Sequence, residues 1–446
     1  MKLVRISAAR GLLSRFFSLF FNPPSYNPSV AMGGLAFSTP GPNGAPPLLV
    51  PRLTTDVYNK LKAEYTSLLQ QIYRIVAVPH EAPGKLDHGD IDFLVEGPQD
   101  DLTNDDVAKH LNAKRQIKNG PTRSYAVPLP HQEDSYVQVD IHICHDGHVK
   151  WDFFMNSYSD LWQIIGVAHR SLGITANDKG LNIRVQELEG INRKASMLFL
   201  TDDPARTMQF LGLDDAKYNS GFRNEDELFA WIAQGRFFNR NIIEERTEKA
   251  NDRRRTAMRG MYRRFLHEWV PTHPDVGAGD QTWTREEVLS EALTTFGKHD
   301  EYDAIMHNFR IQETEATLWK HIAKCLPLED SPLGAALRAL KRWVRFDDGH
   351  PVLRSEAQVG HEGRLIWSVE MHGGKGMSNG GVKDNSGKDD EARILEWVGA
   401  HWEEAKALEK KRVGDEKRER GVKKCLESNL TAEEPANEML GAERGG

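Results

Sequence analysis

The first clear pattern in the chain is an apolar stripe of helical period that begins shortly after residue 54. Its hydrophobic side chains recur at spacings of three or four positions, so they would share one face of a helix. They are Val57, Leu61, Tyr65, Leu68, Leu69 and Ile72. Thr55 or Asp56 can cap its start by accepting a hydrogen bond from a free backbone N–H group. A second helix is expected over residues 101–117, with its cap near Asn104.

Short apolar runs around the second helix predict four strands. They cover residues 74–78, 91–95, 123–129 and 136–144. In the last run, hydrophobic and polar residues alternate, which places Val139 and Asp140 on opposite faces of a sheet. The order helix, strand, strand, helix, strand, strand predicts an α+β domain over one mixed sheet.

The pattern after these strands is mainly helical. Asp203 is a good N-cap, Pro204 suits the first helical position and Gly212 suits the stop, so a helix is expected between them. A long helix is expected over residues 240–270, and a hairpin over residues 352–372.

The end of the chain predicts a charged helix over residues 391–424 with an apolar stripe. The stripe consists of Ile394, Val398, Trp402 and Ala405. The whole pattern predicts four regions, namely a leader and disordered linker over 1–53, the α+β domain over 54–190, a mainly helical domain over 191–372, and a linker, charged helix and disordered tail over 373–446.

Composition limits the cellular compartments and the classes of partner that the chain is expected to have. The formal net charge is −7, so the molecule as a whole does not attract nucleic acid or anionic membranes, and any such binding needs a local patch. No apolar run is long enough to span a bilayer. The three cysteines lie far apart and form no CxxC pair, which favours a reducing compartment.

Residues 1–21 carry several basic side chains, and no acidic residue precedes Asp56. Such a basic, acid-free start is typical of a mitochondrial transit peptide. The alternative is that translation starts at Met32, which leaves a cytoplasmic or nuclear protein. Residues 22–53 are rich in Pro, Gly, Ser and Asn, which favours a disordered linker.

Acidic side chains interrupt two of the predicted strands. Asp90 and Asp92 are two residues apart, so their carboxylates point the same way and repel each other by about 4 kcal/mol. Asp140 lies on the less apolar face of another strand. If the strands are neighbours, the three carboxylates converge, and such oxygen ligands suit Mg²⁺ or Mn²⁺. The alternative is three solvated or salt-bridged acids.

The motif GDIDFLV, followed by VQVDIHI, resembles the nucleotidyltransferase superfamily over about residues 56–145. That family includes DNA polymerase β, poly(A) polymerases and CCA-adding enzymes. The resemblance implies that Asp90 and Asp92 bridge two metal ions and that Asp140 holds the ion that lowers the pKa of an acceptor hydroxyl. It also implies transfer of a nucleoside monophosphate from an NTP to that hydroxyl, with pyrophosphate released.

The chain departs from the family in one motif, because no Gly-Ser pair precedes the acids. Gly84 with Lys85, and Gly89 next to Asp90, are expected to bind nucleotide phosphate instead. The departure motivates a second interpretation, in which the fold has lost catalysis and only binds a nucleotide or RNA. A third interpretation is an interaction scaffold built on the helices and the tail.

Two further clusters carry possible chemistry. Residues 236–265 hold ten Lys or Arg against four Asp or Glu, and the basic helix around Arg253 to Arg264 could bind RNA. A solvated helix face is the alternative. The segment HICHDGH offers residue types that bind zinc, but the spacing matches no familiar zinc pattern, so a polar turn after a strand is the favoured interpretation. Its candidate ligands are His142, Cys144, His145 and His148.

Overall fold

The computed structural model divides the chain into two compact units, Met1–Lys298 and His299–Gly446. The structure describes residues 34–41, 44–246, 256, 259–277, 282–358, 367–371 and 386–430. The expected transit peptide and both candidate first residues, Met1 and Met32, lie outside these residues.

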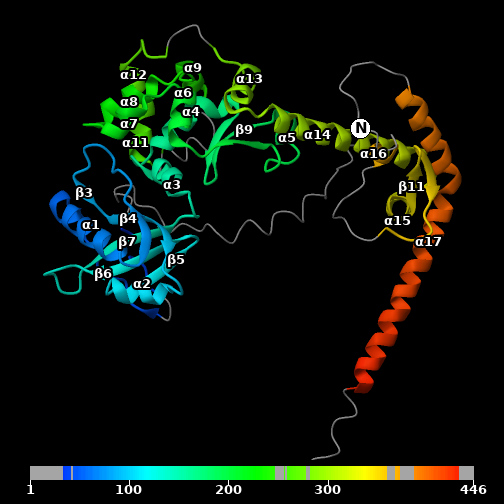
Figure 1. Ribbon diagram of the computed structural model, residues 1–446, viewed down its shortest axis with the longest axis horizontal. Helices are drawn as coiled ribbons and strands as arrows, with labels where there is room; N and C mark the ends of the chain where they lie inside the picture. The colour runs from blue at the N-terminus through cyan, green and yellow to red at the C-terminus, as the bar shows by residue number, and fades with distance from the viewer. Residues whose placement is uncertain are drawn as a thin grey trace, which may run out of the picture. The chain divides into compact units, whose positions relative to one another are not determined.

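A five-stranded mixed sheet forms the base of the first unit (Figure 1). Its strands lie in the order β2, β4, β7, β6, β5, and only β4 and β7 run parallel to each other. The strands are β2 (Tyr73–Ala77), β4 (Asp90–Pro98), β7 (Tyr136–Ile143), β6 (Thr122–Pro128) and β5 (Arg115–Asn119). The expected α+β class with one mixed sheet is therefore confirmed.

One face of this sheet forms the hydrophobic core with α1 (Thr55–Leu69) and α2 (Asn104–His110). Every second residue of β4 and β7 points into it, as the alternation predicted. These core residues are Ile91, Phe93, Val95, Val137, Val139 and Ile141. The opposite face therefore carries the polar residues of the same two strands, and α3 (Val149–Asn156) packs against β4 there.

Two local predictions in this domain were wrong. Val57 is 40% exposed, and Tyr58 is buried instead, because the inner face of α1 starts one residue later. The expected helix over residues 101–117 ends at His110, and Thr103 rather than Asn104 caps it. Residues 115–119 form β5, since Gly120 takes a positive φ of 61° and lets the chain turn back into β6.

The predicted linker is ordered from Gly34 onward in the described part of the chain. Phe37 is fully buried, and Leu49 forms a bridge with Ser135. A short strand, β1 (Leu53–Thr54), pairs with β3 (Asp87–His88). These contacts join residues far apart in sequence, so a composition rich in Pro and Gly did not reveal them.

Helices and a small three-stranded sheet complete the first unit. The start and stop predicted from Asp203 and Gly212 are confirmed, because Asp203 accepts hydrogen bonds from Ala205 and Arg206 and Gly212 has a φ of 68°. The elements are α4 (Leu161–His169), β8 (Ile174–Asn177), β9 (Gly180–Arg184), α5 (Gln186–Glu189), β10 (Met197–Thr201), α6 (Pro204–Leu211), α7 (Asp215–Ser220), α8 (Glu225–Ala233), α9 (Arg240–Arg246), α11 (Gly260–Arg264), a π-helix (Phe265–Trp269), α12 (Val270–Thr272) and α13 (Arg285–Phe296).

The single long helix expected over residues 240–270 was wrong. Arg259 has an extended backbone, with φ −127° and ψ 109°, so a new helix starts at Gly260. Residues 247–255 lie outside the part of the chain that the structure describes.

The second unit is a helical cluster with one hairpin. Its elements are α14 (His299–Cys325), α15 (Asp330–Trp343), β11 (Val344–Asp347), β12 (His350–Leu353), α16 (Trp367–Met371) and α17 (Ser386–Leu430). The hairpin expected over residues 352–372 was wrong. Asp348 and Gly349 both have positive φ and join β12 to the preceding strand β11, while Trp367–Met371 is helical.

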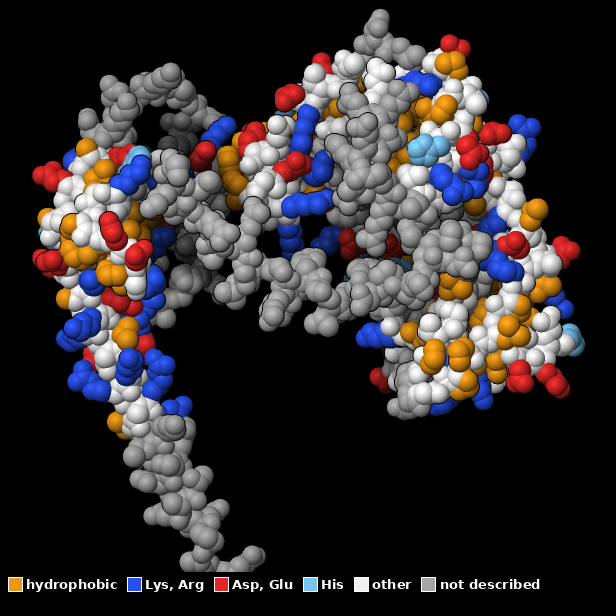
Figure 2. Space-filling model, turned by 180° about the vertical axis from the view of Figure 1, so that it is seen from behind, with side chains coloured by type: hydrophobic (Ala, Val, Ile, Leu, Met, Phe, Trp, Pro, Cys, Tyr) orange, Lys and Arg blue, Asp and Glu red, His pale blue; other side chains and the backbone are white. Residues whose placement is uncertain are grey.

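The predicted tail helix is confirmed, since Ile394, Val398 and Ala405 are buried in the core of this unit. Beyond Ala405, α17 is mostly polar, and Figure 2 shows many Lys and Arg side chains on that part. Within the described ranges, no helix is both long and apolar enough to cross a bilayer.

Candidate functional site

The polar face of the five-stranded sheet brings three aspartates together. Asp92 of β4 lies directly beside Asp140 of β7, and Asp90 lies beside Gln138 one step earlier. Because β4 and β7 are parallel and side chains alternate along a strand, all four side chains share one face. Ser124 of β6 faces Asp140 on the other side of β7.

Asp92 and Asp140 border a hollow of about 420 Å³ in the protein surface. Its floor comes from the sheet, and its walls come from α3 and from the loop that follows β2. The lining residues are Pro79, Asp92, Phe93, Leu94, Thr122, Asp140, His142 and Asn156. The loop is held in place where the His80 backbone N–H donates to Ser157 Oγ at 3.1 Å, just after α3.

The hollow leaves Asp92 open to water while protein atoms surround it on several sides. Burial of the carboxyl group, and then the negative charges of Asp90 and Asp140, raise the pKa of Asp92 to about 8. Burial also raises the pKa of Asp90 and of Asp140. Hydrogen bonds to the Asp90 and Asp140 carboxylates oppose that rise without cancelling it.

Neutral hydrogen bonds are the contacts that the structure gives to these acids. The Gly34 backbone N–H donates to Asp90 Oδ2 at 3.1 Å, and the Gln138 side chain donates to Asp140 Oδ2 at 2.9 Å. Asp140 Oδ1 is buried without a hydrogen bond of ordinary geometry, although the neighbouring Ser124 hydroxyl lies close enough to lower the pKa of Asp140. No Lys or Arg of the described residues forms an ion pair with any of the three carboxylates. The cluster therefore has no ion-pair partner among the described residues, and the charge of Lys85 reaches Asp90 and Asp92 only from beyond ion-pair distance.

A divalent cation fits this arrangement. Three carboxylates from adjacent strands offer the oxygen ligands that Mg²⁺ and Mn²⁺ prefer. Asp140 Oδ1 has a lone pair available for such an ion. The residues present are thus compatible with the expected metal, and Asp90, Asp92 and Asp140 are the side chains that would hold it.

The expected phosphate-binding residues lie next to the acids, but each already has a local role. Lys85 forms an ion pair with Glu81, four residues earlier. Gly84 takes a positive φ of 75° in open space. The carbonyl of Gly89 lies only 2.3 Å from where a side chain on Gly34 would begin, so the N-terminal segment covers it. Nucleotide binding by Gly84, Lys85 and Gly89 stays a prediction.

Glu81 is a fourth acid near this site, and the sequence analysis missed it. Burial alone would raise its pKa, but the hydrogen bond and charge of Lys85 hold the pKa of Glu81 below its usual range. The charges of both Glu81 and Lys85 reach Asp90 and Asp92. No motif marks Glu81, because it lies in a loop whose path only the fold determines.

The basic segment contributes differently from what the sequence suggested. Arg259 pairs with Asp160 at 2.8 Å, and Arg264 pairs with Glu225. These two arginines therefore connect parts of the protein itself. Arg253, with Arg254 and Arg255, lies outside the described residues, so RNA binding by this segment stays a prediction.

The candidate zinc ligands come together in a different combination. His142 and Cys144 lie next to Asp152 of α3, and the ligand atoms of the three side chains lie within 4.8 Å of one another. His145 and His148 are not part of this group. Asp152 was missed because α3 folds back onto the sheet, which the spacing of residues does not show.

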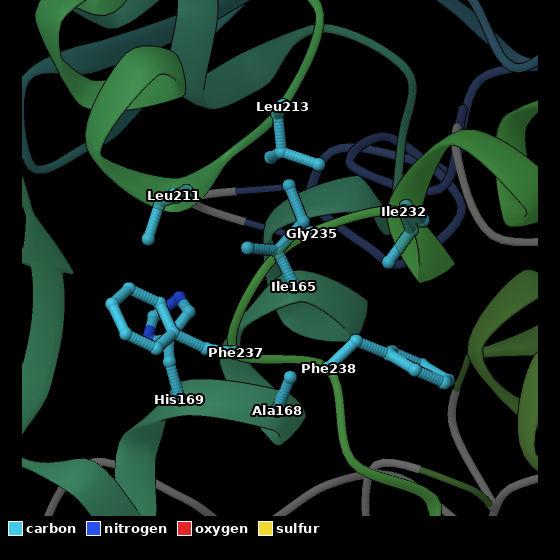
Figure 3. A pocket seen from close by; sticks show the side chains of 9 residues that line it. All are labelled: Ile165, Ala168, His169, Leu211, Leu213, Ile232, Gly235, Phe237 and Phe238. Atoms are coloured by element: carbon cyan, nitrogen blue, oxygen red, sulfur yellow. The ribbon is translucent and has the colours of Figure 1, made fainter. Parts of the chain in front are cut away.

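An apolar pocket between the helices of the first unit offers less chemistry (Figure 3). Figure 3 shows Ile165, Leu211, Leu213 and Ile232 around it, with only His169 as a titratable side chain. The pocket therefore lacks the charged groups found near Asp92.

Comparison with protein-family models and with curated proteins gave no match, so the argument for a function rests on the geometry of the side chains.

Proposed function

We propose that the chain is a metal-dependent nucleotidyltransferase, which transfers a nucleoside monophosphate from an NTP to a hydroxyl. The observation that carries the proposal is the meeting of Asp90, Asp92 and Asp140 on one face of two parallel strands. Their charge lacks a cationic partner among the described side chains. An open hollow beside them gives a substrate access to the acids.

The three carboxylates have distinct tasks in this proposal. Asp90 and Asp92 project together from β4 and would hold ions jointly, while Asp140 approaches from β7. Bound divalent cations supply positive charge that offsets the charge of the phosphates and lowers the pKa of the acceptor hydroxyl. Gln138 orients the Asp140 carboxylate by donating to its Oδ2, which leaves Oδ1 for the ion.

The transfer itself is an in-line displacement at the α-phosphorus. A bond forms from the acceptor oxygen to phosphorus, the bond to the bridging oxygen breaks, and pyrophosphate leaves. The hydroxyl proton passes to water. Lys85 is the cation closest in sequence to the acids, and release from Glu81 would free it for a phosphate.

The proposal specifies only that the acceptor carries a hydroxyl group. RNA, protein and small molecules all carry one. The ion pairs of Arg259 and Arg264 remove two of the arginines that favoured RNA. The experiment must therefore test several acceptors in parallel.

The direct test is incubation of the protein with each α-labelled NTP, Mg²⁺ or Mn²⁺, and separate pools of RNA and protein. We expect label to transfer to one pool with the wild type and not with Asp92→Asn or Asp140→Asn. Asp100→Asn is the matched control, because it removes the same charge from an exposed residue just after β4. Transfer that persists without both Asp90 and Asp92 would contradict the proposal.

A binding module without catalysis is the second candidate, and two observations favour it. Lys85 is already engaged by Glu81, and the backbone of Gly34 covers Gly89 and bonds to Asp90. This candidate predicts that nucleotide or RNA binds without transfer. It also predicts that binding survives Asp92→Asn, so equilibrium binding with labelled NTP separates the two functions.

A further inference from the structure

A second group of ligand-type side chains lies at the far end of the same sheet face. His142 is on β7, Cys144 directly follows that strand, and Asp152 is on α3. Alternation along the strand places His142 and Cys144 on the same side as Asp140. Cys144 and Asp152 are buried, at 7% and 9% exposure, while His142 reaches the hollow.

The separation of these side chains suits one small ion. Each offers a ligand atom, and the three atoms lie within 4.8 Å of one another. His142 Nε2 is 4.0 Å from Asp152 Oδ2, which is too long for a hydrogen bond between them. In a tetrahedral zinc site, ligand atoms about 2.0–2.3 Å from the ion lie about 3.3–3.8 Å apart. Small side-chain rotations would bring the three atoms to that spacing.

The orientation of His142 supports the same reading. Its Nδ1 lies 3.0 Å from the Thr122 hydroxyl on β6, which fixes the ring and turns Nε2 towards Asp152. A histidine that binds a metal usually has its second ring nitrogen in such a hydrogen bond. Thr122 is therefore a positioning residue for His142.

The donor set also selects the metal. Imidazole, thiolate and carboxylate together suit Zn²⁺, whereas Mg²⁺ prefers oxygen ligands alone. The thiolate and the carboxylate would balance the two charges of the ion. Glu96 also faces Cys144, but Arg74 and the Val149 backbone N–H already bind its carboxylate. Three protein ligands leave a fourth position for water.

We propose that His142, Cys144 and Asp152 bind one Zn²⁺, separate from the ions at Asp90, Asp92 and Asp140. The zinc connects the end of β7 to α3 and so fixes the wall of the hollow that Asn156 of α3 provides. This proposal does not depend on nucleotidyl transfer, because it rests on different side chains and a different metal.

The test measures metal binding by the full chain after removal of metal with a chelator. Zn²⁺ is titrated against a chromogenic chelator, and Co²⁺ is added separately to observe thiolate-to-cobalt absorption in the near ultraviolet. We expect one equivalent of Zn²⁺ and a thiolate band with the wild type. Cys144→Ser should abolish that band, and Cys144→Ser, His142→Ala and Asp152→Asn should each weaken Zn²⁺ binding about a hundredfold or more.

Matched variants separate this site from its surroundings. Thr122→Val should weaken Zn²⁺ binding about tenfold, because it loosens His142 without removing a ligand. His145→Ala, in the exposed turn, and Asp92→Asn, in the other cluster, should leave Zn²⁺ affinity unchanged. Absence of a thiolate band with wild-type protein would overturn the proposal even if a variant does not fold. Unchanged Zn²⁺ affinity in folded Cys144→Ser would overturn it as well.

Discussion

Two kinds of carboxylate occur within the first unit, and they differ in how their charge is balanced. Asp160 is buried, and Arg259 Nη1 binds its Oδ1 at 2.8 Å while the Tyr262 N–H lies 3.4 Å from its Oδ2. Glu96 is likewise buried and paired with Arg74 at 2.6 Å. Asp92 has no ion pair with a Lys or Arg of the described residues, and burial, followed by the charges of Asp90 and Asp140, raises its pKa.

This difference in charge balance indicates a different role for each group of carboxylates. A buried charge with a fixed cationic partner holds two segments together, as Asp160 does for the segments around residues 160 and 259. A group of like charges without such a partner costs stability, so its retention calls for a ligand that supplies the missing charge. We therefore propose that the Asp90–Asp92–Asp140 cluster binds a cation, whereas the ion pair of Asp160 with Arg259 joins two segments of the protein.

The largest expected effect concerns the unpaired cluster. Asp92→Asn keeps the size of the side chain but removes a proposed metal ligand, so nucleotidyl transfer should fall by about a thousandfold, which is about 4 kcal/mol of barrier. Steady-state transfer rates with labelled NTP measure it. The matched control, Asp100→Asn, should lose less than about twofold. Equal losses in both variants would remove the distinction between the cluster and ordinary surface acids.

The next effect concerns the paired group. Arg259→Ala leaves Asp160 buried without its cation, so the free energy of unfolding should fall by about 3 kcal/mol. Denaturant titration followed by circular dichroism measures this change. Arg263→Ala removes an exposed arginine from α11, the helix that starts directly after Arg259, and should change stability by less than about 0.5 kcal/mol.

The sequence predicts more about the aspartate cluster than about the ion pair of Asp160. Asp90, Asp92 and Asp140 could be predicted because strand alternation is local and puts carboxylates on the polar face of each strand. Their meeting required β4 and β7 to be neighbours, which only the family resemblance suggested. The partner of Asp160 could not be predicted, since Arg259 lies 99 residues away and reaches it only through the fold.

The same limit explains the errors in the fold. Helix ends that depend on residues close in sequence could be predicted from local chemistry, as for the cap Asp203 and the stop Gly212 of α6. The order of the segment from Gly34 onward could not, because its contacts go to Gly89 and Gln138. Asp152 was missed for the same reason, since α3 reaches His142 and Cys144 through tertiary packing.

A smaller effect should appear in stability without metal. At about pH 9, where Asp92 is ionised, replacing one of the mutually repelling carboxylates should stabilise the metal-free protein, by about 1 kcal/mol for Asp92→Asn because water partly screens the charge. Thermal unfolding in chelator measures the gain. Mg²⁺ at a hundred times its dissociation constant should stabilise the wild type by about 2.7 kcal/mol and the variant far less. Destabilisation by Asp92→Asn in chelator would show that the carboxylate has a stabilising partner.

The smallest effect is the dependence of that stability on pH. The pKa of Asp92 is raised to about 8 in the folded protein, so the folded state keeps a proton that the unfolded chain releases near pH 4. The stabilising contribution of this proton is complete below about pH 4 and is lost as the pH rises through about 8. Because water reaches the carboxyl group, we expect a loss below about 1 kcal/mol.

Denaturant titrations in chelator at about pH 5 and about pH 9, on either side of the pKa of Asp92, measure this loss. Other groups also titrate over this interval, so the informative quantity is the difference between the wild type and Asp92→Asn. The variant lacks the proton in question and should lose less stability as the pH rises. An equal pH dependence in wild type and Asp92→Asn would mean that neither burial nor the charges of Asp90 and Asp140 raise the pKa of Asp92, and the contrast with Asp160 would disappear.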